Sequence, residues 1–349
     1  MTHSSQRHDR EWDAYLAGQP GGLFTQRHGY ARALAATYGH PAVFLRATSV
    51  DGVLRGVLPL LLFAVPGREK RLLSLPFSDA AGMVADQPQA AGDLLREALA
   101  LAARRDCAHL ELRQYDDGAA SWLQPEALPS GWSHEAYTFK IGLCRDLPAS
   151  ACTLWGRLPD KVRNQVRKAR RHGATVRVGG SELLADFYAV FAENMRDLGS
   201  PVHDPRLFAR LLGDPSLEAA VLVVDLGGRA AAAAVVFIHE GTMSNPWASS
   251  RRPLRPYCVN MLLYWAMLEL AIARGCGVFD FGRSTADSPA HRFKGQWGAK
   301  TRPLSWHVFS RRGAKWRPEL ERLADPRWQG LDLGQANLKG PLVRRFISL

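Results

Sequence analysis

A strand–helix–strand pattern occurs twice in this sequence, and this duplication restricts the fold more than any other feature. The first copy has helical periodicity over 90–105 and a short strand over 109–113. The second has an apolar helix over 260–274 and a strand over 278–283. Cys107 lies 169 positions before Cys276, so the two copies are in register. A period of this length is a whole domain, and the chain is expected to contain one α/β domain twice.

A predicted β-hairpin precedes each copy. In the first half, strands over 42–50 and 53–63 flank Asp51-Gly52, a pair that tolerates the positive φ of a tight turn. In the second half, Gly227-Gly228 plays the same part between strands over 220–226 and 229–239, and a strand over 242–250 follows.

The length of 349 residues fits two domains. We expect an N-terminal domain over 1–145, a C-terminal domain over 146–325 and a tail over 326–349.

The net charge of +12 is concentrated in two segments. Residues 157–177 contain eight basic residues and one acid, and residues 292–322 contain nine and two. Such clusters indicate an anionic partner such as a phosphate, a nucleic acid or a membrane surface, although charge can also serve solubility alone. The first segment includes a predicted basic helix over 160–172 that ends at Gly173. A thin apolar stripe of Val162, Val166 and Ala169 would be its buried side. A further helix is expected over 187–198.

Several protein classes lack their minimum signal. The longest apolar runs fall far short of the ~20 residues that cross a bilayer, and the N-terminus resembles no signal peptide. The five cysteines are odd in number and have no C-x-x-C spacing, so we predict no disulfide framework, no metal site and a cytoplasmic location. The motifs of P-loop proteins, dinucleotide-binding folds, zinc proteases and serine hydrolases are missing.

Residues 279–298, "FDFGRSTADSPAHRFKGQWG", are the most informative stretch. A strand ends at Gly282, and Arg283 and Ser284 follow at its carboxyl end, where α/β sheets commonly bind ligands. Arg283 can bind a carboxylate or phosphate, Lys294 can stabilise an oxyanion, and Trp297 offers a flat apolar surface. The alternative is a structural pair of Asp280 and Arg283 beside a buried tryptophan.

Four segments in order resemble the FemAB-like proteins, and more closely the subgroup associated with exopolysaccharide and PEP-CTERM/exosortase loci. They are "KVRNQVRKARRHG", "FYAVFAENMRDLGSPV", "NMLLYWAMLELAIARG" and "FDFGRS…FKGQWG". Further similar segments near both ends, "FTQRHGYARALAATYGH", "LLSLPFSDAAGMVAD" and "GPLVRRF", extend the resemblance over nearly the whole chain.

The resemblance implies an α/β fold of two tandem GNAT-like domains with mixed sheets. It also implies an acyltransferase or aminoacyltransferase that acts on an amine in cell-envelope, peptidoglycan or exopolysaccharide biosynthesis. The better-known Fem relatives take their aminoacyl group from aminoacyl-tRNA. The lysine of their F-K motif is thought to stabilise the reaction intermediate, which makes Lys294 the first catalytic candidate, with Arg283 and Ser284 beside it.

The resemblance implies an acyl-CoA or an aminoacyl-tRNA as the donor, and no tightly bound cofactor is expected. Acetyltransferases bind the CoA diphosphate through an [RQ]-x-x-G-x-[GA] loop, and the nearest string here, 170–175, fails at its last position. The long helical arm of tRNA-dependent Fem proteins is not evident either.

The remaining candidates concern substrate binding. Arg163, Arg167 and Lys168 would hold a phosphate-bearing substrate, such as a nucleotide-sugar, a lipid diphosphate or tRNA, unless the helix is merely solvated. Further candidates from the second domain are Asn245, Trp247 and Tyr264, with Trp297. The two aromatic residues Trp247 and Tyr264 line an acceptor site or belong to the core.

Three other residues have more than one interpretation. Cys258 is a nucleophile or, more commonly for such a residue, a buried thiol. His203 faces the pocket or, more commonly, lies on the surface, and Asp280 is expected to be a structural partner of Arg283 or of a backbone group.

The expected partner is an anionic or glycolipid-linked substrate, with tRNA as a further candidate and no DNA. Peripheral contact with the inner membrane stays open, although three basic residues in 338–349 attract anionic lipid too weakly for stable docking. The competing hypothesis is a non-catalytic protein that binds RNA or another polyanion through the helix over 160–172.

Overall fold

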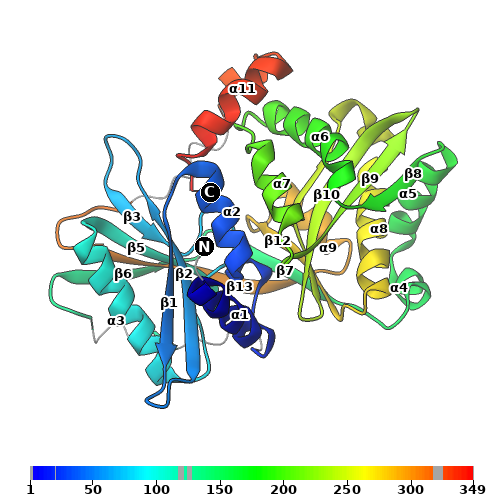
Figure 1. The fold of residues 1–349 in the computed structure, drawn as a ribbon. Coiled ribbons are helices and arrows are strands. Elements are labelled where there is room, and N and C mark those ends of the chain that lie inside the picture. Colours follow the sequence, from blue (N-terminus) through cyan, green and yellow to red (C-terminus); the bar gives the residue numbers. More distant parts are fainter. Residues whose placement is uncertain (1–2, 20, 117–121, 124–127, 317–324, 349) are drawn as a thin grey trace. The chain divides into compact units, whose positions relative to one another are not determined.

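The computed structural model describes residues 3–19, 21–116, 122–123, 128–316 and 325–348 (Figure 1). The chain forms two compact units. The first comprises Met1–Gly142, Arg302–Pro318 and Ser348–Leu349, and the second comprises Leu143–Thr301 and Glu319–Ile347.

The sheet of the first unit contains an antiparallel hairpin followed by a parallel crossover. Its strands lie in the order β1 (Ala42–Thr48), β2 (Leu54–Phe63), β3 (Lys70–Leu73), β5 (Cys107–Tyr115) and β13 (Lys300–Arg311). Two short strands, β4 (Val84–Ala85) and β6 (Trp132–Tyr137), pair with β2 and β13. Strands β1, β2 and β3 are antiparallel in turn, whereas β3 and β5 are parallel and are joined through α3 (Pro88–Arg104).

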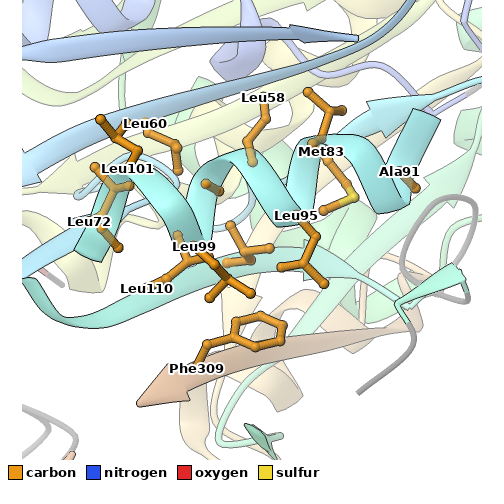
Figure 2. Packing of buried hydrophobic residues seen from close by; sticks show 14 of the residues in the cluster. Leu58, Leu60, Leu72, Met83, Ala91, Leu95, Leu99, Leu101, Leu110 and Phe309 are labelled. Atoms are coloured by element: carbon orange, nitrogen blue, oxygen red, sulfur yellow. The ribbon is translucent and has the colours of Figure 1, made fainter. Parts of the chain in front are cut away.

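Helix α3 supplies one side of the core of this unit (Figure 2). The helix predicted from periodicity over 90–105 is confirmed, and Leu94, Leu95 and Ala98 of α3 are all buried. These side chains pack against leucines of β2, β3 and β5 and against Phe309 of β13. Pro88 occupies the first helical position, where a backbone N–H would have no intrahelical partner. Proline lacks this N–H, so it starts the helix without losing a hydrogen bond.

The second unit repeats this topology. Its strands lie in the order β8 (Thr175–Gly179), β9 (Glu218–Leu226), β10 (Arg229–His239), β11 (Thr242–Ser250), β12 (Val278–Ser284) and β7 (Ile141–Asp146). Strands β9, β10 and β11 are antiparallel in turn, and β11 and β12 are parallel and joined through α8 (Val259–Ala273). The predicted duplication and the α/β fold with mixed sheets are therefore confirmed.

Helices cover both faces of the second sheet, since β10 is buried continuously from Ala230 to Phe237. Helix α6 (Leu184–Asp197) packs on β10 and β11, and α8 packs on β9, β10 and β11 (Figure 1). The basic helix forms as predicted: α5 (Asp160–Arg171) packs on α8 through Val162, Val166 and Ala169. Helices α4 (Ala151–Arg157) and α7 (Pro205–Gly213) complete this unit's main helices.

Two segments depart from the expected domain limits. Most of β13, from Arg302 onward, belongs to the first unit although it lies late in the sequence. The segment expected as a separate tail carries α10 (Pro326–Gln329) and α11 (Leu333–Arg344), which pack on α6 of the second unit. Helices α1 (His3–Ala17) and α2 (His28–Tyr38) belong to the first unit and α9 (Pro289–Gly295) to the second. No helix in the described parts of the chain is long and apolar enough to span a bilayer.

Candidate active site

Strands β11 and β12 pair only at their beginnings. Their parallel ladder covers three residue pairs and ends at Ser244 and Asp280, although both strands continue. A bulge lies immediately beyond this point, because Asn245 and Pro246 of β11 stand opposite the single residue Val236 of β10. A bulge bends a strand and redirects its side chains. The two strands therefore stop pairing at Asn245, a polar residue whose side chain the bulge redirects.

The end of β12 has an irregular backbone that buries Ser284. The carboxylate of Asp280 accepts a hydrogen bond from the Gly282 N–H at 2.8 Å, and Gly282 has a φ of +72°, which favours glycine. Burial alternates before this residue and changes phase after it, so Ser284 is only 5% exposed. The predicted contact of Asp280 with a backbone group is confirmed.

Helix α9 places Lys294 against this strand end. The helix begins at Ser288, whose hydroxyl accepts a hydrogen bond from the His291 N–H. Lys294 is 9% exposed, and its ammonium donates to the main-chain carbonyl of Arg283 at 2.7 Å. The F-K motif thus brings Lys294 beside Arg283 and Ser284.

Tyr264 of α8 lies at the centre of the aromatic residues here. Its ring centroid is 4.8 Å from that of Phe293, 6.0 Å from Phe281 and 6.1 Å from Trp297. The side chain of Asn245 hydrogen-bonds its phenol. Burial raises the pKa of Tyr264 to about 12, against a smaller lowering by Asn245, so the phenol stays neutral at physiological pH.

Trp297 is held by a residue that sequence patterns did not identify. Arg145 of β7 donates a hydrogen bond to the Trp297 carbonyl. A Cβ on Gly298, whose φ is +76°, would lie 2.8 Å from this guanidinium, so glycine is needed both for the turn and for the close approach. Arg145 lies more than 150 residues before Trp297 in the sequence, and no local pattern links them.

Several polar atoms in this region are buried without a hydrogen-bond partner among the described residues. They include Oδ1 of Asn245, Oγ of Ser284 and Nε1 of Trp297, and the Trp297 side chain is completely buried. Unsatisfied buried polar groups are rare and costly, and they are tolerated where function needs them. These three atoms comprise two acceptors, one of which can also donate, and one N–H donor.

Not every predicted residue belongs to this group. Trp247 of β11 packs instead with His203, Phe208 and Phe237, with ring centroids 5.1–6.2 Å away. The core interpretation is therefore the one that fits Trp247.

The predicted cations of α5 lie on another element. Arg163 forms an ion pair with Asp160, and Arg167 donates to Asn164 at 3.1 Å and lies over the Trp155 ring. Lys168 is half-buried on the same helix.

The second basic segment divides between the two units. Arg292, Lys294 and Lys300 belong to the second unit, while residues 302–316 belong to the first, and 317–322 lie outside the described residues. In the first unit, Arg311 and Arg312 line a cavity of about 550 Å³ together with Arg68, Glu69, Lys70, Asp106, Ala108, Gly313 and Ala314. The segment is therefore not one local patch.

The string over 170–175 connects α5 to β8, so it does not join a strand to the crossover helix. That connection is 251–258, which precedes the first turn of α8 and carries the exposed Arg252 and Arg255. A helix N-terminus with nearby arginines favours phosphate groups. The [RQ]-x-x-G-x-[GA] pattern does not identify this loop, because residues 251–258 contain no glycine.

Two predictions about single residues are wrong. His203 is buried, and its Nε2 accepts a hydrogen bond from Arg344 of α11 at 3.2 Å. Cys258 is half-exposed immediately before α8, in a backbone conformation with φ of +62°.

Residues 160–295 match the model of the Acetyltransferase (GNAT) domain. This stretch contains α5, the strands β11 and β12, and Lys294. A solved structure of FemX is similar over 86% of this chain and 95% of that chain, with a TM-score of 0.68 and 16% identity. The chain has the fold of FemX. No curated protein matches it by sequence.

Two more structures share the tandem architecture. One is a tandem GNAT protein from the clavulanic acid biosynthesis pathway, with a TM-score of 0.52 and 13% identity over 90% of this chain and 98% of that one. The other is the C-terminal domain of a protein designated a lysylphosphatidylglycerol synthetase from Agrobacterium fabrum, with a TM-score of 0.55 and 13% identity over 86% and 91%. The tandem GNAT-like fold implied by the FemAB-like resemblance is therefore confirmed.

Proposed function

We propose that the chain transfers an acyl or aminoacyl group from an activated donor to an amine on an anionic precursor of the bacterial cell envelope, in peptidoglycan or exopolysaccharide synthesis. The observation that carries the proposal is the set of three unpartnered buried polar atoms beside Lys294, where β11 and β12 stop pairing. The fold supports acyl transfer as the class of reaction. The structural similarity to a protein designated a lysylphosphatidylglycerol synthetase supports an aminoacyl group as one candidate for the transferred group.

The reaction needs an oriented carbonyl, a neutral amine and a partner for the oxyanion. The amine nitrogen forms a bond to the carbonyl carbon, and the C–S or C–O bond to the donor's leaving group then breaks. The proton lost by the amine ends on the leaving group. Negative charge develops on the carbonyl oxygen between these steps, and a fixed cation in a buried site stabilises it strongly.

Lys294 is the residue proposed for this charge. Its ammonium donates to the Arg283 carbonyl, which holds the positive charge beside the end of β12. Oδ1 of Asn245 would accept an N–H of the substrate, and Nε1 of Trp297 would donate to a substrate oxygen. Ser284 would do either, which makes a peptide-like or amide-bearing group a suitable ligand. Arg283 and Tyr264 complete the proposed site.

The anionic parts of the substrates would bind outside this buried group. Arg252 and Arg255, before the first turn of α8, are proposed to bind donor phosphates, whether these belong to CoA or to tRNA. The basic face of α5, with Arg163, Arg167 and Lys168, is proposed to hold an anionic acceptor. Binding through α5 should then weaken steeply with salt.

A transfer assay tests the proposal directly. The purified chain is incubated with candidate donors and amine acceptors, chosen by mass spectrometry of metabolites that co-purify with it, and product formation is measured by mass spectrometry. Lys294→Gln should lower kcat by at least ~100-fold, the scale of one lost oxyanion donor. Lys300→Gln is the matched control, because Lys300 lies on the same segment but is exposed.

A Lys294→Gln variant that transfers as fast as the unchanged chain would reject the proposed role of Lys294. The enzyme hypothesis itself is rejected if no pair of donor and acceptor gives a product and polyanion binding is lost in an Arg163→Gln/Arg167→Gln variant but kept in Lys294→Gln, which would favour the polyanion-binding alternative.

A further inference from the structure

Helix α11 turns its apolar side chains away from the protein. Its buried residues are Ala336, Gly340 and Arg344, spaced four apart on one face. The opposite side carries Leu338, which is 73% exposed, and Leu342, which is 63% exposed, together with the exposed Val343. A helix that packs only on its own domain buries its large apolar residues and exposes its polar ones. In α11 this pattern is inverted.

The orientation of α11 is fixed by specific contacts on its inner face. Gly340 approaches Val202 so closely that a Cβ there would lie 2.9 Å from the Val202 backbone nitrogen. Arg344 is buried and donates from Nε to Nε2 of His203 at 3.2 Å. Rotating the helix to bury its leucines would break both contacts, so the leucines stay outside.

The part of α11 that carries these leucines is basic. Residues 333–348 contain three basic residues, of which Arg344 is buried, and no acid, while the exposed Asp332 precedes the helix. Lys339 is exposed and lies next to Leu338 in sequence, and Arg345 follows the helix. Apolar residues combined with cations and no carboxylate are typical of helices that lie in the interface of an anionic membrane.

We propose that the outer face of α11, formed by Leu338, Lys339, Leu342 and Val343, docks this protein reversibly on an anionic lipid surface. Basic residues alone would attract such a surface too weakly for docking. The leucines supply the missing part, since burying one leucine changes a partition constant about tenfold or more. A second copy of the chain fits less well as the occupant, because two such faces would bring Lys339 and Arg345 against their own counterparts.

Vesicle co-sedimentation of the full chain tests this proposal without any substrate, so its outcome is independent of the proposed transfer reaction. The probes are vesicles of phosphatidylglycerol with phosphatidylcholine, and vesicles of phosphatidylcholine alone. We expect binding to the anionic vesicles that is at least about tenfold stronger and that falls with added salt.

The double variant Leu338→Gln/Leu342→Gln should lose at least about tenfold in binding, because each glutamine removes the apolar contribution without changing the charge. Val50→Gln/Val53→Gln is the matched control, since these exposed valines lie in the first unit and should not matter. Both variants change exposed positions and should fold normally, which circular dichroism verifies.

Three outcomes would overturn the proposal. The first is that the unchanged chain does not bind anionic vesicles. The second is that the leucine variant binds them as well as the control does. The third is that light scattering finds a dimer which the leucine variant abolishes while vesicle binding is absent, which would assign the face to a second copy.

Discussion

Ser284→Ala should make the protein more stable and its transfer reaction slower. The Ser284 hydroxyl is 5% exposed and has no hydrogen-bond partner among the described residues. A buried hydroxyl that loses its bonds to water without replacement costs about 1–3 kcal/mol. Alanine removes this cost and leaves the small side chain in place. We expect the free energy of unfolding to rise by about 1 kcal/mol and the melting temperature by about 2–4 °C.

Ser249→Ala is the matched control. Ser249 is also buried in the second unit, but its hydroxyl accepts a hydrogen bond from Nδ2 of Asn194 at 3.2 Å. The same substitution there leaves the amide without its partner, and it should lower the free energy of unfolding by about 1–3 kcal/mol. Urea unfolding of the two variants should therefore give changes of opposite sign.

Activity decides whether the Ser284 hydroxyl serves a substrate. One hydrogen bond to the bound substrate is worth about 0.5–1.5 kcal/mol, so Ser284→Ala should lower kcat/KM by roughly 2–10-fold. The reasoning is refuted if Ser284→Ala destabilises the chain as much as Ser249→Ala does. It is also refuted if the variant gains stability and transfers at the unchanged rate.

Three further variants test other parts of the structure. Burial and the neighbouring His134 lower the pKa of His307 to about 4. The free energy of unfolding should therefore fall by about 3 kcal/mol as the pH drops from 6.5 towards 4, and urea unfolding of His307→Asn should show a smaller fall. Glu111→Gln should cost about 3–5 kcal/mol in the same assay, because it leaves the completely buried Arg113 without its carboxylate. Gly298→Ala and Gly313→Ala should each lower the free energy of unfolding by about 1–3 kcal/mol, because both glycines have positive φ. Gly298→Ala should reduce transfer more than Gly313→Ala does, because only the Cβ at position 298 would displace the Arg145 guanidinium.

Much of the fold could be predicted because its signals are local. Strands β10 and β11 begin and end at the predicted residues, and α5 buries the three predicted side chains. The duplication was visible for the same reason, since each copy places a crossover helix and its strand close together in sequence. The F-K motif also lies close in sequence to the strand end that it contacts, with Lys294 11 residues after Arg283, so Lys294, Arg283 and Ser284 could be grouped in advance.

The parts that could not be predicted depend on contacts between distant segments. Arg145 contacts Trp297 from β7, and β13 joins a sheet whose other main strands all lie before residue 116. The burial of His203 depends on α11, which lies about 140 residues later. Trp247 illustrates a different cause: a bulge of one residue separates its environment from that of Asn245, and no sequence pattern predicts that bulge.

The duplication also shows how one architecture can hold two different interiors. The offset of 169 residues aligns Asp280 with Glu111 and Gly282 with Arg113. In the second unit, Asp280 binds the Gly282 backbone, and the strand continues to the unpartnered Ser284. In the first unit, the Arg113 side chain stands where the second unit has only a glycine. It donates to Glu111 at 2.6 Å and to the carbonyl of Ser348 at 2.7 Å.

This difference favours the second unit as the place of the proposed chemistry. Arg113 and Glu111 are both completely buried and satisfy each other, and Ser348, which is itself buried, completes the network. A substrate at this position would have to displace Ser348 and leave a buried guanidinium with fewer partners, which is costly. In the second unit a substrate would instead supply hydrogen bonds that the protein does not make. The same strand–helix–strand frame therefore favours ligand binding where its strand end carries Gly282, and a closed structural interior where it carries Arg113.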